Sequence, residues 1–328
     1  MSQNELKPLK TLMPLFTVDT PPYMHLGFTI RGMIRDTVIA LLPAAILAVV
    51  AFGVGPIRVM ALSMGTAIFA DAFCLYLQKR DMRLYDGTAL VTGLIFAFLL
   101  PPGAPWWLVI IGAAVCSILG RQIFGGLGAN PLCPALVGWA VLTISWPTYM
   151  DPTAMTLDTD FVDPLLQLKL FGLQSLPEGS EAALFLGQQL GGLGSSQIAA
   201  VLAGGFYMLL RRVVRWEIVL SYVLGVVATA SLFWCIDPQA YLRPDMYFLT
   251  GCTVFAAFFL VTDSSSSPVG PIGMVLFGLL AGTLTVLIRV YGIYPDGAPF
   301  AVLVANLATP LLDMIRPVPY GKSKRRSV

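Results

Sequence analysis

Residues 87–105 read GTALVTGLIFAFLLPPGAP, a short apolar run that a pair of prolines ends. A second short run, residues 251–268, reads GCTVFAAFFLVTDSSSSP and also ends in polar residues and a proline. Each run is followed by a longer apolar stretch with an arginine near its end, Arg121 or Arg289, and then by a Gly/Pro loop and a further apolar stretch. The chain therefore contains an internal repeat, and this order of short and long apolar stretches decides the fold.

The composition places the chain in a membrane. Of its 328 residues, 57% are hydrophobic and only 12% are charged, with a mean hydropathy of +0.79. Ordinary soluble domains contain about 45–50% apolar and about 25% charged residues. The net charge of +2 gives no reason to expect a nucleic-acid partner. The cysteines have no CxxC spacing, so we expect small buried packing residues and no metal site at Cys74, Cys116, Cys133, Cys235 and Cys252.

Apolar runs bounded by charge, proline or glycine predict the membrane spans. A spanning helix needs about 17–25 mostly apolar residues. Ten candidates emerge, of which the third and the eighth are short. They are residues 36–55, 59–78, 88–101, 106–124, 132–147, 198–210, 217–235, 247–262, 272–288 and 299–315.

The order of these spans predicts an all-α polytopic membrane protein built from two five-helix repeats. An acidic insert separates the repeats. The expected organisation is an N-terminal segment 1–35, a first repeat 36–147, the insert 148–197, a second repeat 198–315 and a basic tail 316–328.

The lysines and arginines predict how the chain is oriented. Most of them fall in the segments on the side of the two termini, and short cytoplasmic loops retain such residues. Both termini are therefore expected in the cytoplasm, with the acidic insert outside. Because five spans is an odd number, the second repeat must be inverted relative to the first. Inverted repeats with short, Gly/Pro-interrupted segments point to a site near the bilayer midplane.

Several motifs resemble one family of membrane redox subunits. This family contains the D-type subunit of the Rnf complex and the B subunit of the sodium-pumping NADH:quinone oxidoreductase. The resemblance covers about residues 23–313. It is carried by DGTALVTG at 86–93, LPP at 100–102, PWW at 105–107, GGLGANP at 125–131, FFLVTD at 258–263 and YPDG at 294–297.

The resemblance implies a ten-helix subunit of a complex that passes electrons between ferredoxin and NAD and moves Na⁺ or H⁺. Such a subunit is a translocase component, carries no catalytic residues of its own and is not a complete enzyme. It would work in a bacterial inner membrane with Rnf subunits of the A, B, C, E and G types. The family's fold is also related to that of urea transporters. Isolated carboxylates at helix ends suit both ions, so the coupling ion stays open.

The resemblance also implies flavin. Family members join the phosphate of FMN to a threonine in the outward segment, but this chain reads DTDFVDPL at 158–165 and places Asp163 at that position. A carboxylate forms no stable phosphoester, and its charge repels the phosphate. The neighbouring hydroxyls of Thr153, Thr156 and Thr159 stand outside the family's motif. We therefore expect FMN or riboflavin held without a covalent bond.

The candidates for a flavin pocket combine small size, hydroxyl groups or amide groups with membrane depth. They are Thr88, Thr92, Gly126, Gly128, Asn130 and Asn306. Glycine-rich turns that enter a helix expose N–H groups suited to anionic or carbonyl ligands, although close packing explains such turns equally well.

Two other functions fit the same fold. A stand-alone small-solute channel or carrier would need no flavin. A redox-inactive scaffold subunit would assemble with its partners and also lack flavin.

Overall fold

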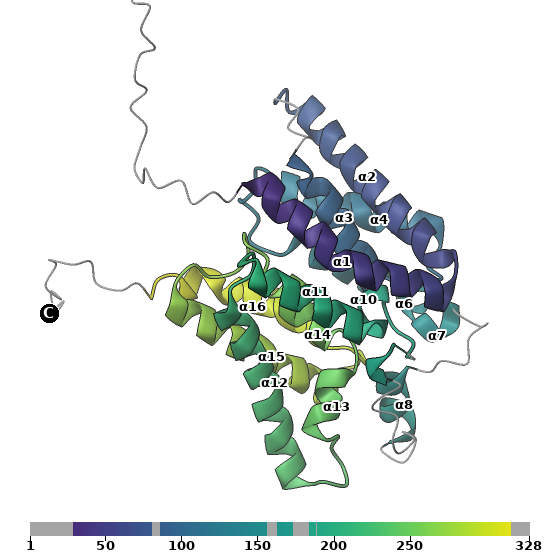
Figure 1. Cartoon of the computed structure of the whole chain (residues 1–328), viewed down its shortest axis with the longest axis vertical. Helices are drawn as coiled ribbons and strands as arrows, with labels where there is room; N and C mark the ends of the chain where they lie inside the picture. Colours follow the sequence, from purple (N-terminus) through teal and green to yellow (C-terminus); the bar gives the residue numbers. More distant parts are fainter. Residues whose placement is uncertain (1–28, 81–85, 156–162, 173–183, 188, 316–328) are drawn as a thin grey trace, which may run out of the picture.

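The computed structural model describes residues 29–80, 86–155, 163–172, 184–187 and 189–315 (Figure 1). These residues form helices, turns and loops, and no strand occurs among them. Four helices are long and apolar enough to span a membrane, so the chain is a multi-pass membrane protein. They are α1 (Ile30–Phe52), α2 (Gly55–Leu77), α12 (Trp216–Ile236) and α15 (Pro271–Tyr291).

Shorter apolar helices complete the bundle, and α3 is too short to span the hydrocarbon. At about 1.5 Å per residue, the twelve residues of α3 rise about 18 Å, against about 30 Å of hydrocarbon. These helices are α3 (Thr88–Leu99), α4 (Trp106–Ser117) with its continuation η2 (Ile118–Gln122), α5 (Pro134–Ser145), α11 (Ile198–Leu210) and α16 (Ala298–Leu312).

The eighth expected span, 247–262, begins later than predicted. Residues up to Leu249 belong to a separate short helix, α13 (Pro244–Leu249), and Gly251 then turns the backbone with φ +63°. A positive φ suits glycine, which has no Cβ, and it interrupts the helix. The apolar helix itself consists of α14 (Thr253–Phe255) and η4 (Ala256–Leu260).

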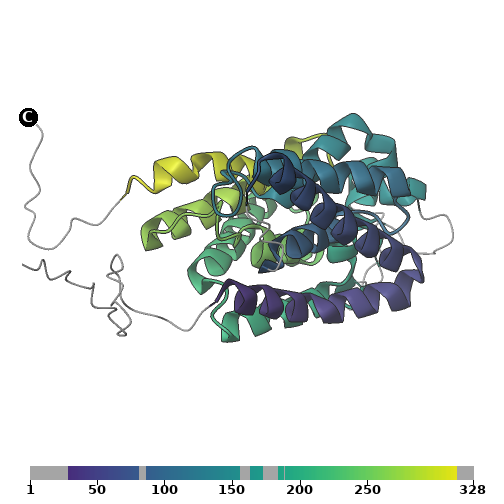
Figure 2. The ribbon, with the colours of Figure 1, turned by 90° about the horizontal axis from the view of Figure 1, so that it is seen from above.

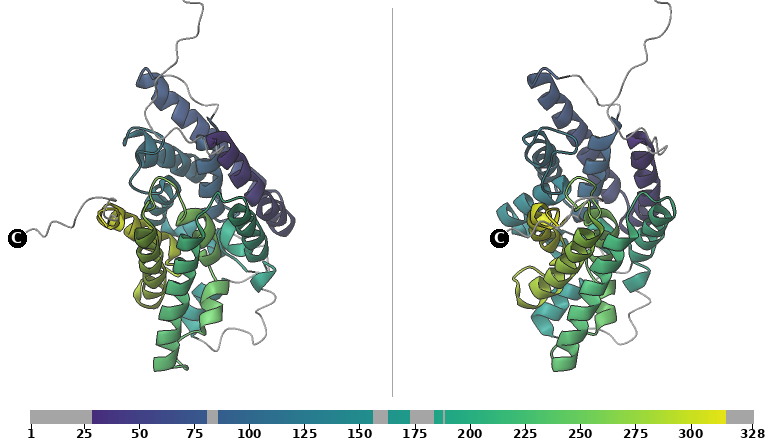
Figure 3. Two further views of the ribbon diagram at one scale, coloured as in Figure 1. Left: turned by 60° about the vertical axis from the view of Figure 1, so that its left-hand side comes forward. Right: turned by 90° about the vertical axis from the view of Figure 1, so that its left-hand side faces the viewer.

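Helices of equal rank in the two halves of the chain contact each other. α1 lies against α11 (Figures 1 and 2), and α5 contacts α16. Within the second half, α12 packs along α15. At the α1–α11 contact, a Cβ on Gly204 would come within 2.0 Å of the carbonyl oxygen of Ala40. α1 and α16 lie on opposite sides of the molecule (Figure 3). Small residues let the helix backbones approach closely, as is usual within membranes.

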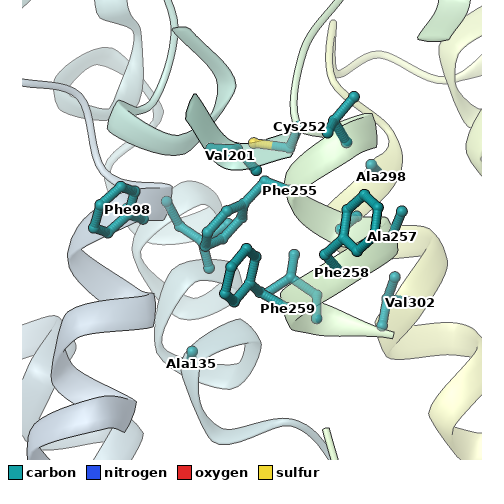
Figure 4. Close-up of a cluster of buried hydrophobic side chains, with 14 of the residues drawn as sticks. Phe98, Ala135, Val201, Cys252, Phe255, Ala257, Phe258, Phe259, Ala298 and Val302 are labelled. Atoms are coloured by element: carbon teal, nitrogen blue, oxygen red, sulfur yellow. The ribbon is translucent and has the colours of Figure 1, made fainter. Parts of the chain in front are cut away.

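The short helices meet in the centre of the molecule. The ring of Phe98, at the end of α3, stacks on Phe255 with centroids 5.7 Å apart, and Phe255 stacks on Phe259 at 5.3 Å (Figure 4). The end of the insert packs against this core. α10 (Leu193–Ser196) contacts α3, and the Leu193 amide donates to the Leu100 carbonyl at 3.0 Å.

The rest of the described insert lies at one end of the bundle. It contains three short helices, α6 (Pro147–Met150), α7 (Pro152–Met155) and α8 (Pro164–Phe171). α8 contacts the loop after α15, because the Lys169 ammonium donates to the carbonyls of Gly292 and Tyr294. We call this end, where α1 and α5 finish, the insert end.

Candidate functional site

A cavity of about 530 Å³ lies at the opposite end of the bundle, where α1 and α3 begin and α16 finishes. Its walls come from both halves of the chain, namely α1, α3, η2, η4 and α16 with the loops beside them. It gathers four of the predicted flavin residues, Thr88, Thr92, Gly128 and Asn130. The volume falls within the range of about 300–1,000 Å³ typical of small-molecule sites.

A buried arginine provides the positive charge of the cavity. The side chain of Arg121 is 9% exposed, and its guanidinium donates to the Thr88 hydroxyl at the start of α3. A second guanidinium nitrogen lies 3.9 Å from one carboxylate oxygen of Asp71. The other oxygen of Asp71 accepts from the Gln122 amide. The Nε of Arg121 has no hydrogen-bond partner among the described residues. The site thus retains an unused donor on a buried cation.

A polar network joins the two halves across the cavity. The Asn130 amide donates to the Ser265 hydroxyl at 2.6 Å and to the Leu132 carbonyl at 3.0 Å. The hydroxyls of Ser265 and Ser266 donate to the Asp263 carboxylate at 3.1 and 2.9 Å. These contacts hold the loop before α5 against the loop after η4, and they leave amide, hydroxyl and carboxylate groups lining one space.

The glycine loop has the geometry of a turn that presents its backbone. Gly125, Gly126 and Gly128 all have positive φ, at 111°, 102° and 83°. The Gly126 carbonyl accepts from the Ala129 amide, which closes the turn. Gly128 lines the cavity, whereas Gly126 is not among its lining residues.

Asn306 is not part of the cavity lining. It lies in α16 and is 1% exposed. Its side-chain oxygen and nitrogen both lack partners among the described residues. The structure therefore separates it from the four predicted residues that come together.

Asp163 lies at the insert end, far along the bundle from the cavity. Its carboxylate caps α8 by accepting from the amides of Leu165 and Leu166, at 2.9 and 3.4 Å. The pKa of the Asp163 carboxyl is raised to about 7, chiefly by burial; the two amides oppose this rise, and repulsion from Asp296 and Asp151 contributes to it. The Thr153 hydroxyl donates to Asp151, while Thr156 and Thr159 lie outside the described residues.

Sequence reasoning missed the buried arginine of the cavity. Arg121 is interpreted from the sequence as a flank of a span, yet it is buried together with Asp71. The available signal was the position of each charge inside an apolar stretch, which is costly in a membrane and marks function or tight pairing. Three of the five cysteines are buried as expected, whereas Cys74 is half-buried and Cys235 is exposed.

The bundle and its cavity define a polytopic membrane protein with a polar site between its two halves. The model of the NQR2, RnfD, RnfE family matches residues 17–321, and the chain belongs to this family. It is 35% identical to the D subunit of the ion-translocating oxidoreductase complex of Yersinia enterocolitica, over 94% of this chain and 99% of that protein. Proteins of the same name from Yersinia pseudotuberculosis and Salmonella arizonae are 34% and 33% identical, over 93% and 94% of this chain and 98% and 99% of theirs.

Proposed function

We propose that this chain is the D-type membrane subunit of an ion-translocating oxidoreductase complex of the Rnf class. Within the complex it takes part in flavin-mediated electron transfer coupled to the movement of Na⁺ or H⁺. The observation that carries this proposal is the cavity, which gathers Thr88, Thr92, Gly128 and Asn130 around the buried Arg121. Relatives named as D subunits of such a complex align over nearly their whole length, which supports the same assignment.

The residues at the insert end do not fit a covalent FMN. The Asp163 carboxylate already accepts two backbone hydrogen bonds as a helix cap, and it has no hydroxyl to esterify. The Thr153 hydroxyl is held by Asp151 at 2.7 Å. We therefore place no covalent flavin on Asp163.

The residues of the cavity fit a flavin held without a covalent bond. Arg121 has an unpaired Nε donor among the described residues, Asn130 and the two threonines offer hydrogen bonds, and the Gly128 backbone can approach a ligand closely. A bound flavin would supply electron transfer, and the protein would tune it through hydrogen bonds and charge. Arg121 would hold the anionic or carbonyl edge of the ring system, while Thr88 keeps the guanidinium in place.

We also propose that the fold consists of two inverted five-helix repeats related to urea transporters. Two observations support this. α1 and α11 run antiparallel, because Asp36 meets Arg211 while Ala40 meets Gly204. Gly87 and Gly251 precede the two short helices with φ of +70° and +63°. The boundaries proposed for the repeats are 36–147 and 198–315, between the N-terminal segment 1–35, the insert 148–197 and the tail 316–328.

The same proposal gives the orientation. The cavity end carries most of the basic residues, so it faces the cytoplasm together with both termini, and the insert end faces outward. The membrane is the bacterial inner membrane, and the partners are the other subunits of the complex, of the A, B, C, E and G types.

The test is flavin retention by a matched pair of variants. In Thr92→Val, a hydroxyl that lines the cavity is replaced by a methyl group of similar size. Thr66→Val is the control, because Thr66 is also half-buried and its hydroxyl also donates to the carbonyl four residues earlier, but it lies in α2 outside the cavity lining. Flavin is measured by fluorescence of the denatured gel band and by absorbance of the released fraction.

The proposal expects a dark gel band, flavin in the released fraction, and a lower flavin content in Thr92→Val than in Thr66→Val. Fluorescence that stays with the band would mean a covalent flavin and would return attention to the insert threonines. No flavin in either fraction would favour the scaffold or the stand-alone carrier.

A further inference from the structure

A second cavity, of about 520 Å³, lies between the beginning of α1 and the end of α11. Its lining includes four arginines and one carboxylate: Arg31, Arg35, Arg211, Arg212 and Asp36. It differs chemically from the first cavity, which we proposed for flavin, because almost every charge in its lining is positive. We call it the arginine pocket.

The charges in the arginine pocket do not balance. Asp36 is buried, and its carboxylate pairs with Arg211 at 3.1 Å and with Arg35 at 3.6 Å. The Tyr207 hydroxyl also donates to it, at 3.5 Å. Among the described residues, Arg31 and Arg212 have no carboxylate within ion-pair distance, so two exposed guanidinium groups remain available.

The backbone adds to the attraction for an anion. α1 is 23 residues long, and its N-terminus opens into the pocket at Thr29 and Arg31. The Thr29 hydroxyl accepts from the Gly32 amide, which leaves other first-turn amides without a helical acceptor. Guanidinium forks and helix N-termini are the two groups that proteins most often use to bind phosphate oxygens.

The surroundings of the pocket are apolar and exposed. Leu210 lines it and is 68% exposed, Ile30 at the start of α1 is 49% exposed, and Phe206 one turn before Leu210 is 56% exposed. The charges stop where the apolar part of α1 begins, because residues 37–52 contain no Asp, Glu, Lys or Arg. The pocket thus sits where a spanning helix leaves the hydrocarbon, with positive charge on one side and apolar side chains on the other.

We propose that the arginine pocket binds the phosphate group of an anionic phospholipid, whose acyl chains lie along α1 and α11. Arg31 and Arg212 bind the phosphate oxygens, while Arg35 and Arg211 are held in position by Asp36. A lipid bound there contacts both α1 and α11, the first helices of the two halves of the chain.

The test uses the full chain purified in detergent and titrated with dioleoyl phosphatidylglycerol, followed by native mass spectrometry. The pocket variant is Arg31→Gln/Arg212→Gln. The control is Lys79→Gln/Arg215→Gln, which removes the same charge from exposed positions at the same end of the bundle but outside the pocket. Dioleoyl phosphatidylcholine, with the same acyl chains, tests the headgroup, and sodium phosphate against sodium chloride at equal ionic strength tests the free anion.

The proposal expects phosphatidylglycerol to bind more tightly than phosphatidylcholine. At about 1 kcal/mol for each basic residue near an anionic lipid, the pocket variant should bind it roughly 30-fold more weakly, and the control should bind it like the parent chain. Equal binding by parent and pocket variant would overturn the proposal, as would an equal loss in the control. Binding of inorganic phosphate to the same arginines without binding of the lipid would overturn it too. Thermal unfolding of both variants without lipid shows that each is folded.

Discussion

The strongest stability prediction concerns Arg289, whose side chain is 2% exposed. Its guanidinium donates to the carbonyls of Tyr247 and Thr250 at 2.8 and 3.0 Å and to the Asp296 carboxylate at 2.9 Å. Asp296 in turn accepts from the Cys252 amide at 2.6 Å and the Ala298 amide at 3.2 Å. The ion pair of the buried Arg289 with the half-buried Asp296 therefore connects α15 to both segments of the broken eighth span and to the start of α16.

Replacing Arg289 by Met would leave the carboxylate and two carbonyls without their donor. Removal of one partner from a buried pair costs about 3–5 kcal/mol, so Arg289→Met should unfold far more easily than the parent chain. Asp296→Asn should be less damaging, because the amide oxygen still accepts from the backbone. The double variant should lose less than the sum of the single losses, since neither charge is then left alone.

The measurement is the midpoint of unfolding in one detergent, followed by tryptophan fluorescence. The exposed pair Arg243–Asp245, at 2.8 Å, is the matched control, because its side chains are 62% and 40% exposed and such pairs contribute about 0.2–1 kcal/mol. Additive losses in the Arg289 and Asp296 double variant, or an Arg289→Met loss no larger than that of Arg243→Met, would contradict this prediction.

Three further predictions test other parts of the molecule. Asp163→Asn should remove most of the pH dependence of α8 docking. In the parent chain the pKa of the Asp163 carboxyl is raised from 3.8 to about 7, so docking is strongest at low pH and weakens as the pH rises between these two values. Hydrogen exchange of the α8 amides at pH 5.5 and 8.5 measures this change. A parent chain whose α8 docking does not depend on pH would contradict the prediction. Gly204→Ala should lower the free energy of unfolding by about 1–3 kcal/mol, because the added Cβ forces α11 away from α1. Gly65→Ala adds a Cβ in open space and should not lower the unfolding midpoint. Equal midpoints for the two variants would contradict this. Tyr222→Phe should cost about 0.5–1.5 kcal/mol, because it removes a buried hydrogen bond to Thr285 of 3.1 Å, and an unchanged midpoint would show that the bond contributes nothing.

The sequence predicts the helices well where apolar length alone decides them. The sixth expected span, 198–210, coincides with α11, and the ninth, 272–288, lies within α15. The sequence-based prediction fails where the backbone turns, as at Gly251, because an apolar run on either side of a glycine gives no sign that the glycine has a positive φ. The burial of α10 was also missed, since its residues, LGSS, have neither length nor hydrophobicity to mark them.

Sequence reasoning also selected part of the cavity lining, again from local properties alone. Thr88, Thr92, Gly128 and Asn130 were chosen for small size and polar groups at membrane depth, and these properties belong to residues that line cavities. The partners of each residue depend on tertiary contacts that span long stretches of chain. Asn130 contacts Ser265 and Arg121 lies beside Asp71, and both pairs are separated in the sequence by more residues than any local pattern covers. Asn306 has the same local properties but lies outside the cavity lining, so composition and depth do not separate a lining residue from a buried one.

An aspartate at position 163, where the family resemblance implies a threonine, would change the chemistry without requiring a different local structure. Threonine and aspartate are both good helix N-caps, because each places an oxygen within reach of the amides two and three residues later. Asp163 makes those two contacts, so α8 begins at Pro164 and its Lys169 still reaches the loop after α15. A threonine there would cap the same helix and also offer a hydroxyl for a phosphoester. The fold therefore does not require a hydroxyl at position 163, and a flavin held in the opposite cavity would not depend on one.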